Sequence, residues 1–138
     1  MKGLVVDPIK DLLHLYADAV CRQDADQWIA TWSESGTWDL GHGEPVSGKG
    51  PLKTFWISSM SRFDTVIHTY SNNISELDAD SGTGFGRAYV TEWLKPAEGE
   101  TLVLHGFYDD LYVFENDKWL FRERVLNRVY MGKADFSD

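Results

Sequence analysis

The first third of the chain places its apolar residues with the spacing of helices. Asp7 and Pro8 form a helix start, an N-cap side chain followed by proline at the first helical position. Apolar side chains then recur every three or four positions as far as Arg22, which predicts an amphipathic helix over 8–22. Asp24 can cap a second, shorter helix whose inward stripe consists of Trp28, Ile29 and Trp32. Both predicted helices have one apolar face and need a surface to cover.

The middle of the chain is broken by a glycine-rich stretch. Residues 37–40 alternate as a short strand, and residues 41–50 are predicted as a loop because they hold four glycines and one proline. This loop lacks the spacing of a phosphate-binding loop. Pro51 starts a third helix that is expected to end near Arg62 or Phe63.

From Thr65 onward the apolar positions follow a period of two, which is the spacing of strands. Strands are predicted at about 65–77, 83–95, 101–115 and 118–131, with turn-forming residues between them. Short connections predict a meander of antiparallel neighbours. Helices first and long strands afterwards indicate an α+β protein with helices packed on one face of a strongly curved antiparallel sheet. The length suits one domain, expected over 1–138.

Composition narrows the classes of partner and compartment. With 22 acidic and 13 basic side chains, a net charge of −9, the chain repels phosphate backbones and anionic headgroups, so we expect no nucleic-acid or membrane partner. Cys21 is the one cysteine, which excludes an intramolecular disulfide and fits a reducing compartment. No apolar run has the length of a signal or membrane span, so a cytoplasmic protein is predicted. Aromatic residues at 14% suit a large core or an enclosed cavity.

The strand that begins near Thr65 carries a single imidazole. Side chains alternate between the faces of a strand, so Val66, His68, Tyr70 and Asn72 are expected to share one face. A titratable ring among polar and aromatic neighbours is typical of a pocket wall. A histidine is also an effective general base near neutral pH, because its unperturbed pKa is about 6.5. The alternative is a core histidine satisfied by one hydrogen bond.

The order of these elements resembles the SnoaL-like branch of the nuclear-transport-factor-2-like superfamily. The resemblance is carried by the early helix leading to Trp38, the strand with Val66, Ile67 and His68, and the segments 106–112 and 118–124. It implies a cone-shaped sheet closed by three helices around an apolar pocket. Within that branch the chain is similar to cofactor-free lyases, namely hexachlorocyclohexane dehydrochlorinase, scytalone dehydratase and bile-acid dehydratase.

The same resemblance implies roles for particular residues. His68 falls on the histidine that removes a proton, whereas Cys21 falls on the aspartate that orients it. Tyr16 matches a tyrosine of the bile-acid enzyme, and Arg124 matches an arginine of the dehydrochlorinase pocket. Leu40 aligns with the general-base aspartate of ketosteroid isomerase, so an isomerase of that type is disfavoured. The expected ligand-binding residues are Trp38, Leu40, Phe55, Tyr70 and Tyr108.

The cysteine at the aspartate's place leaves several alternatives open. A thiol is a weak partner for an imidazole, so a working base needs another acid. The candidates, each otherwise a solvated surface charge, are Asp18, Asp24, Glu92 and Asp110. Arg124 can bind a leaving group or an oxyanion, or form a cross-strand ion pair with Glu92 or Asp110. Cys21 can act as a nucleophile near His68, although a lone helical cysteine is usually a small hydrophobe.

These observations predict a cofactor-independent lyase or isomerase that acts on a small, largely apolar molecule. His68 is expected as the base, with Tyr16 and Arg124 as electrophilic partners. The alternative is a non-catalytic small-molecule binding protein that has lost the His-Asp dyad. No metal site is expected, because the histidines lack ligand spacing and only His105 and His68 can approach across strands. The resemblance also implies a homo-oligomer, a dimer or trimer.

Overall fold

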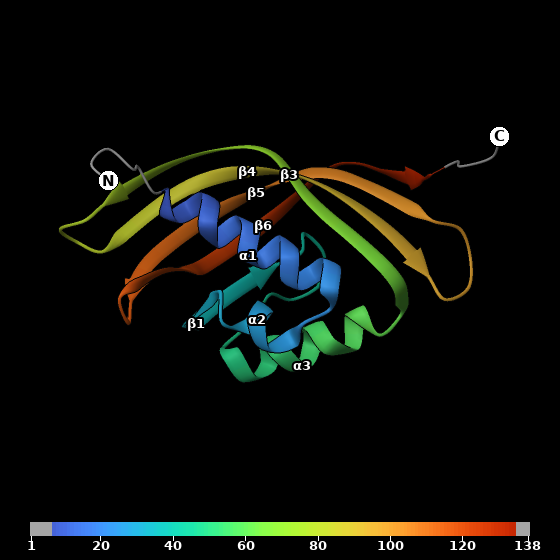
Figure 1. Cartoon of the computed structure of the whole chain (residues 1–138), viewed down its shortest axis with the longest axis horizontal. Coiled ribbons are helices and arrows are strands. Elements are labelled where there is room, and N and C mark those ends of the chain that lie inside the picture. Colours follow the sequence, from blue (N-terminus) through green and yellow to red (C-terminus); the bar gives the residue numbers. More distant parts are fainter. Residues whose placement is uncertain (1–6, 135–138) are drawn as a thin grey trace, which may run out of the picture.

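Three helices lie on the concave side of an arched sheet in the computed structural model, which describes residues 7–134 (Figure 1). The helices are α1 (Pro8–Arg22), α2 (Ala25–Ile29) and α3 (Lys49–Met60). The strands are β1 (Trp32–Asp39), β2 (Val46–Ser47), β3 (Phe63–Asp78), β4 (Thr83–Pro96), β5 (Leu102–Glu115) and β6 (Lys118–Lys133). Residues 1–6, which belong to the N-terminal stretch where no signal-length apolar run is expected, lie outside the described residues. Within 7–134 no helix is both long and apolar enough to cross a membrane.

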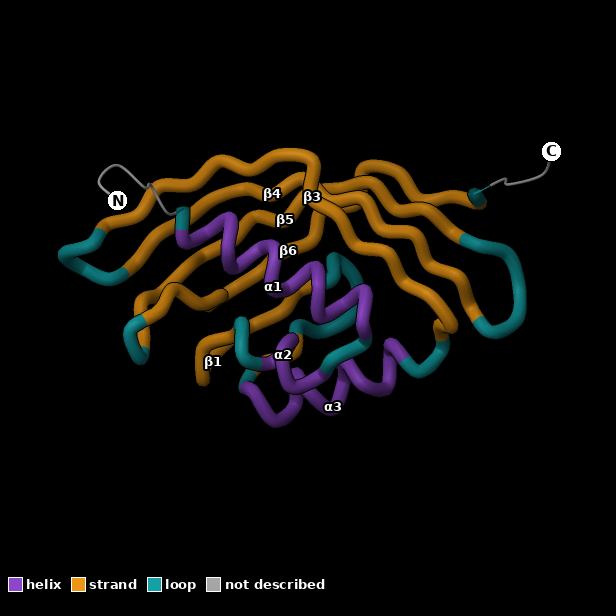
Figure 2. Tube along the Cα trace, in the orientation of Figure 1, coloured by secondary structure: helices purple, strands orange, loops and turns teal. Residues whose placement is uncertain are grey.

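The sheet has six strands in the order β2-β1-β6-β5-β4-β3 (Figure 2). The four long strands pair as antiparallel neighbours, which confirms the predicted meander and the α+β class. β1 pairs in parallel with β6, with Trp38 opposite Arg124, a pairing that the sequence did not specify. β3 forms one edge of the sheet, and its contacts with α1 are the most extensive between any helix and strand of the described residues.

The helices follow the predicted pattern with three differences at their ends. The Asp7 side chain caps α1 by accepting from the backbone N–H groups of Ile9 and Lys10, and the helix has its predicted bounds. α2 is shorter than predicted, because the N–H of Phe121 bonds to the carbonyl of Thr31 and draws the chain into the sheet. Trp32 is therefore the first residue of β1, although it remains fully buried. α3 begins at Lys49, before the predicted start at Pro51, and it ends at Met60, before the predicted end near Arg62 or Phe63.

A bulge in β3 changes which side chains face the helices. The register against β4 shifts between Tyr70 and Asn72. Val66 and His68 are buried and Tyr70 is half-buried, but Asn72 is exposed. The expectation that Asn72 shares their face is therefore wrong, because the bulge interrupts the alternation.

A second bulge, in β6, decides where Arg124 points. Tyr112 pairs with Phe121 and Leu111 pairs with Glu123, so Arg122 is the extra residue. Arg122 is exposed while Arg124 is fully buried, so these two residues do not share a face as simple alternation predicts. Bulges of this kind bend strands and increase their twist, which contributes to the arch of the sheet.

Gly106 lies at a third register shift, between β5 and β6, where the backbones approach closely. A Cβ at this position would collide with the carbonyl oxygen of Asn127, a rigid backbone atom. We expect Gly106→Ala to lower the free energy of unfolding by about 1–3 kcal/mol, as overpacking does. Gly50→Ala, in the first turn of α3, is the matched control because its Cβ would meet no atom within 4 Å. Urea unfolding of both variants measures the difference, and equal losses would contradict this explanation.

Candidate functional site

A cavity of about 590 Å³ lies between the helices and the concave face of the sheet. Its volume is in the range of small-molecule sites. The wall is mostly apolar and aromatic. Its residues come from α1, from α3, from every strand except β2, and from the connecting loops. Trp38, Leu40, Phe55 and Tyr108, expected to bind a ligand, line this cavity, and so does Tyr16. Tyr70 does not line it.

His68 and Glu92 are opposite residues of β3 and β4, and their side chains meet. The Nδ1 atom of His68 lies 2.6 Å from Oε2 of Glu92. A carboxylate only accepts hydrogen bonds, so we assign the proton of the neutral imidazole to Nδ1 and the lone pair to Nε2. The His68 side chain is 2% exposed and that of Glu92 23%, and Glu92 lines the cavity whereas His68 does not. The carboxylate therefore stands between the imidazole and the cavity.

The other three acids considered for this place are engaged elsewhere. Asp18 and Asp24 both pair with Arg22 on the surface of α1 and α2, and Asp24 also caps α2. Asp110 is bonded to Arg124. Glu92 is thus the acid of this group that reaches the imidazole.

Cys21 contacts the backbone of His68. Its Sγ accepts from the His68 N–H at 3.3 Å and donates to the His68 carbonyl at 3.7 Å. β3 is an edge strand, and these two groups point away from β4. The thiol therefore bonds two backbone groups that no neighbouring strand pairs with. Cys21 is exposed on α1 and lies outside the cavity wall. The position that the resemblance assigns to an aspartate therefore has a backbone contact in this chain.

Arg124 is fully buried and forms a bidentate ion pair with Asp110. Its Nε lies 2.8 Å from Oδ1 and its Nη2 3.2 Å from Oδ2 of that residue, which is directly opposite on β5. Its Nη1 donates to the Tyr70 hydroxyl at 2.8 Å. The guanidinium carbon lies 3.8 Å from the ring centre of Tyr108 and 4.6 Å from that of Tyr16. Arg124 thus supports the aromatic wall from behind and does not line the cavity.

Tyr16 and Tyr108 bring phenol groups to the cavity wall. Burial raises the pKa of Tyr16, and burial raises the pKa of Tyr108 well above its usual value. The positive charge of Arg124 lowers the pKa of both tyrosines and so opposes the effect of burial. The negative charge of Glu92 raises both pKa values. The phenols therefore stay protonated at neutral pH and can donate hydrogen bonds. Trp38 Nε1 donates to the Tyr108 oxygen at 3.4 Å and helps to fix it.

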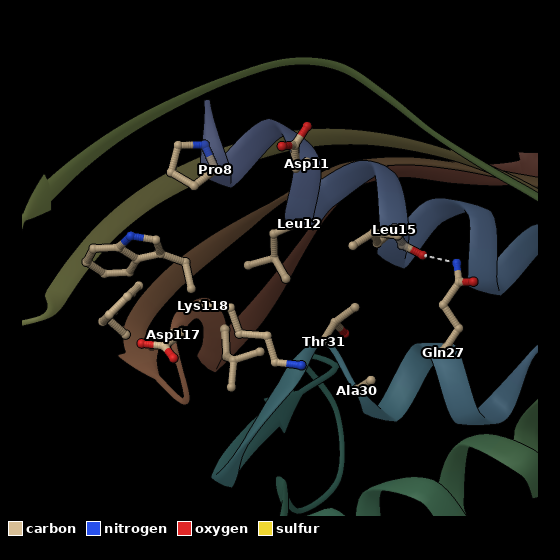
Figure 3. A pocket seen from close by; sticks show the side chains of 12 residues that line it. Pro8, Asp11, Leu12, Leu15, Gln27, Ala30, Thr31, Asp117 and Lys118 are labelled. Atoms are coloured by element: carbon tan, nitrogen blue, oxygen red, sulfur yellow. Dashed lines mark hydrogen bonds between the residues drawn. The ribbon is translucent and has the colours of Figure 1, made fainter. Parts of the chain in front are cut away.

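A second hollow, of about 520 Å³, lies between the first half of α1, α2 and the turn from β5 to β6 (Figure 3). Its polar groups near α2 are already bonded. Gln27 donates to the Leu15 carbonyl at 2.9 Å (Figure 3). Thr31 donates to the Trp28 carbonyl at 2.6 Å. This hollow has no histidine and no hydrogen-bonded pair of titratable side chains in its wall. The chemistry therefore favours the cavity beside Glu92.

The remaining histidines lie apart from His68. His105 is exposed, and its Nδ1 lies 3.0 Å from the Thr91 hydroxyl. Thr91 alternates with Glu92 along β4, so His105 lies on the opposite face of the sheet and does not approach His68. His14 and His42 are exposed. Among residues 7–134, no group of three or more His, Cys, Asp or Glu side chains is arranged to hold a metal ion.

An arched sheet that holds an apolar cavity against three helices defines the cone architecture of the nuclear-transport-factor-2-like superfamily. Within it, the chain belongs to the SnoaL-like domain family, which matches residues 5–125. No curated protein matches the chain.

Three solved structures illustrate the likeness. A candidate scytalone dehydratase from Novosphingobium aromaticivorans DSM 12444 has a TM-score of 0.84 and 17% identity over 94% of this chain and 87% of that chain. A candidate aromatic ring hydroxylase from Novosphingobium aromaticivorans has a TM-score of 0.84 and 20% identity over 92% and 91%. The hexachlorocyclohexane dehydrochlorinase LinA-type3 from Novosphingobium barchaimii LL02 has a TM-score of 0.79 and 16% identity over 94% and 90%. At these identities the likeness establishes the fold.

Removing Arg124 would leave the Asp110 carboxylate buried without its partner. We expect Arg124→Met to lower the free energy of unfolding by about 3–5 kcal/mol. Arg122→Met is the matched control, since Arg122 is exposed at the bulge of the same strand, and it should change stability by less than about 0.5 kcal/mol. Guanidinium chloride unfolding measures both. Adding Asp110→Leu to Arg124→Met should recover part of the loss, and a double variant as unstable as the single one would argue against the unpaired charge as its cause.

Proposed function

We propose that the protein is a cofactor-independent lyase or isomerase that acts on a small, largely apolar molecule, with the His68–Glu92 pair as its base. The supporting observation is the 2.6 Å contact between the imidazole and a carboxylate that lines an apolar cavity. Membership of the SnoaL-like family agrees with this class. Two of the similar structures are named as a candidate dehydratase and a dehydrochlorinase, and both names denote eliminations.

The pair can move a proton without a cofactor. Glu92 accepts from His68 through Oε2, which leaves Oε1 to take a proton from a substrate carbon. In an elimination, the electrons of the broken C–H bond form a double bond as a leaving group departs from the neighbouring carbon. In an isomerisation, the same proton returns to a different carbon. Neither reaction changes the oxidation state of the protein or requires a second substrate.

The surrounding groups suit this chemistry. A general acid or base contributes about 10²–10⁴-fold to a rate when it is held in place. The imidazole fixes Glu92 from behind, as a carboxylate fixes the histidine in a serine-protease triad, with the order of the two groups reversed. Tyr16 and Tyr108 can donate to a substrate oxygen that gains negative charge as the proton leaves.

Replacing either member of the pair should remove turnover while the protein stays folded. We expect Glu92→Gln and His68→Gln each to lower kcat/KM by about 10²–10⁴-fold. The assay is turnover of a panel of β-hydroxyketones and chlorinated cyclohexanes, followed by chromatography of the products, with thermal unfolding as the measure of folding. Glu76→Gln is the matched control, because Glu76 is an exposed carboxylate on the same strand as His68 and lies outside the cavity wall.

The outcomes separate this proposal from its alternatives. Wild-type turnover in both variants would show that the pair is not the base. A folded wild-type protein that binds panel compounds but converts none of them would support the non-catalytic binding protein. A large loss of stability in His68→Gln with unchanged turnover per folded molecule would identify His68 as a core residue.

A further inference from the structure

Two arginines lie in the exposed part of the cavity wall, in a protein whose net charge is −9. Arg62, Arg128 and His42 all line the cavity and are all exposed, and we call this part of the wall the cavity mouth. Most lysines and arginines of the described residues have a carboxylate partner. Arg62 and Arg128 have none within the described part of the chain. Other cationic side chains of residues 7–134 also lack a carboxylate partner, but Arg62 and Arg128 are two such arginines that line the same cavity.

The contacts of Arg128 position its guanidinium group without neutralising its charge. Its Nη2 donates to the Nε2 of His42 at 2.9 Å, which makes that ring nitrogen an acceptor. Its Nη1 lies 3.7 Å from the sulfur of Met131. Neither partner carries a negative charge, so neither neutralises the guanidinium.

Arg62 contributes a second charge from the turn after α3. Its guanidinium carbon lies 6.0 Å from the ring centre of Phe63, an arrangement that leaves its donors free of a carboxylate. Glu98 is an exposed acidic residue of the same wall, and within residues 7–134 it forms no ion pair with either arginine. The other acid in the wall, Glu92, is bonded to His68.

We infer that the substrate carries a carboxylate on its apolar body, and that Arg62 and Arg128 bind this carboxylate at the cavity mouth. The inference rests on the proposed function and adds the chemical class of the substrate, a small hydrophobic organic acid. Arginine recognises a carboxylate through paired N–H donors, and the apolar wall accepts the rest of the molecule. Glu92 repels the same carboxylate, so the two charges orient the substrate with its acid group outward and its reacting carbon toward Glu92.

Two probes of the same shape test the charge requirement. 2-Naphthoate and 2-naphthamide share one ring body and differ in charge, and Trp38 and Trp56 in the wall report binding by fluorescence. We expect the acid to bind about tenfold more tightly than the amide at low salt, and the difference to shrink as salt is added.

Variants then assign the effect to residues. Arg62→Gln and Arg128→Gln should each weaken naphthoate binding by about fivefold to tenfold and leave naphthamide unchanged, as loss of one partly exposed charge contact does. Glu98→Gln should strengthen naphthoate binding. Arg122→Gln is the matched control, because Arg122 is an exposed arginine without a carboxylate partner within residues 7–134 that lies outside this cavity wall. It should change the affinity for neither probe.

Each result supports or overturns the inference. Equal affinities for acid and amide, no binding of either, or acid binding that both arginine variants retain would overturn it. If any one of these three results is obtained while Glu92→Gln still abolishes turnover, the proposed function stands and the substrate class is wrong. If the arginines select the acid but Glu92→Gln leaves turnover unchanged, the anion site stands and the proposed reaction is wrong.

Discussion

Two full charges, Arg124 and Asp110, are buried opposite each other between β5 and β6. Taking such ions out of water costs several kcal/mol each, so the pair persists only with good geometry and satisfied hydrogen bonds. Both conditions are met: the contact is bidentate, the Tyr112 hydroxyl donates to Asp110, and Arg124 donates to the Tyr70 hydroxyl. The guanidinium also lies against the rings of Tyr16 and Tyr108. The inner wall of the cavity therefore packs against an ion pair whose disruption would lower the stability by several kcal/mol.

This wall also determines how His68 relates to the cavity. The ring of Tyr70 lies edge-on to the imidazole at 4.8 Å, and that of Tyr16 lies 5.4 Å away. They enclose the imidazole so that Nε2 is buried without a hydrogen-bond partner among the described residues. The Nδ1 atom is hydrogen-bonded to Glu92, and the carboxylate of Glu92 lines the cavity. In the proposed reaction the histidine thus acts through the carboxylate, and the fixed rings keep both groups in position.

The sequence predicts the elements well, because their periodicity is strong, and the site less well, because the site depends on bulges. Counting back from the Asp78 and Thr83 pair places Trp93 opposite His68. The bulge between Tyr70 and Asn72 shifts the register by one residue and brings Glu92 there instead. Bulges depend on packing between strands and leave no clear local signal in the chain. For the same reason the sequence offered four acids without a means to choose among them.

The sequence did not predict a binding role for Arg62 and Arg128, for a different reason. Arg62 follows a helix and Arg128 lies late in the last strand, so nothing in their spacing connects them. Their significance comes from the carboxylates that they lack, which depends on the positions of all the acidic side chains in three dimensions.

Cys21 and Glu92 are best understood together. At position 21 a side chain faces both the N–H and the carbonyl of His68 on the open edge of β3, and a thiol can accept from one and donate to the other. An ionised carboxylate can accept but cannot donate, so an aspartate would satisfy one of these groups and repel the other. A carboxylate on β4 reaches the imidazole ring directly by cross-strand pairing. With the acid on the strand, the helix position is free for a backbone contact, and the carboxylate lies in the cavity wall, where the proposed reaction needs it.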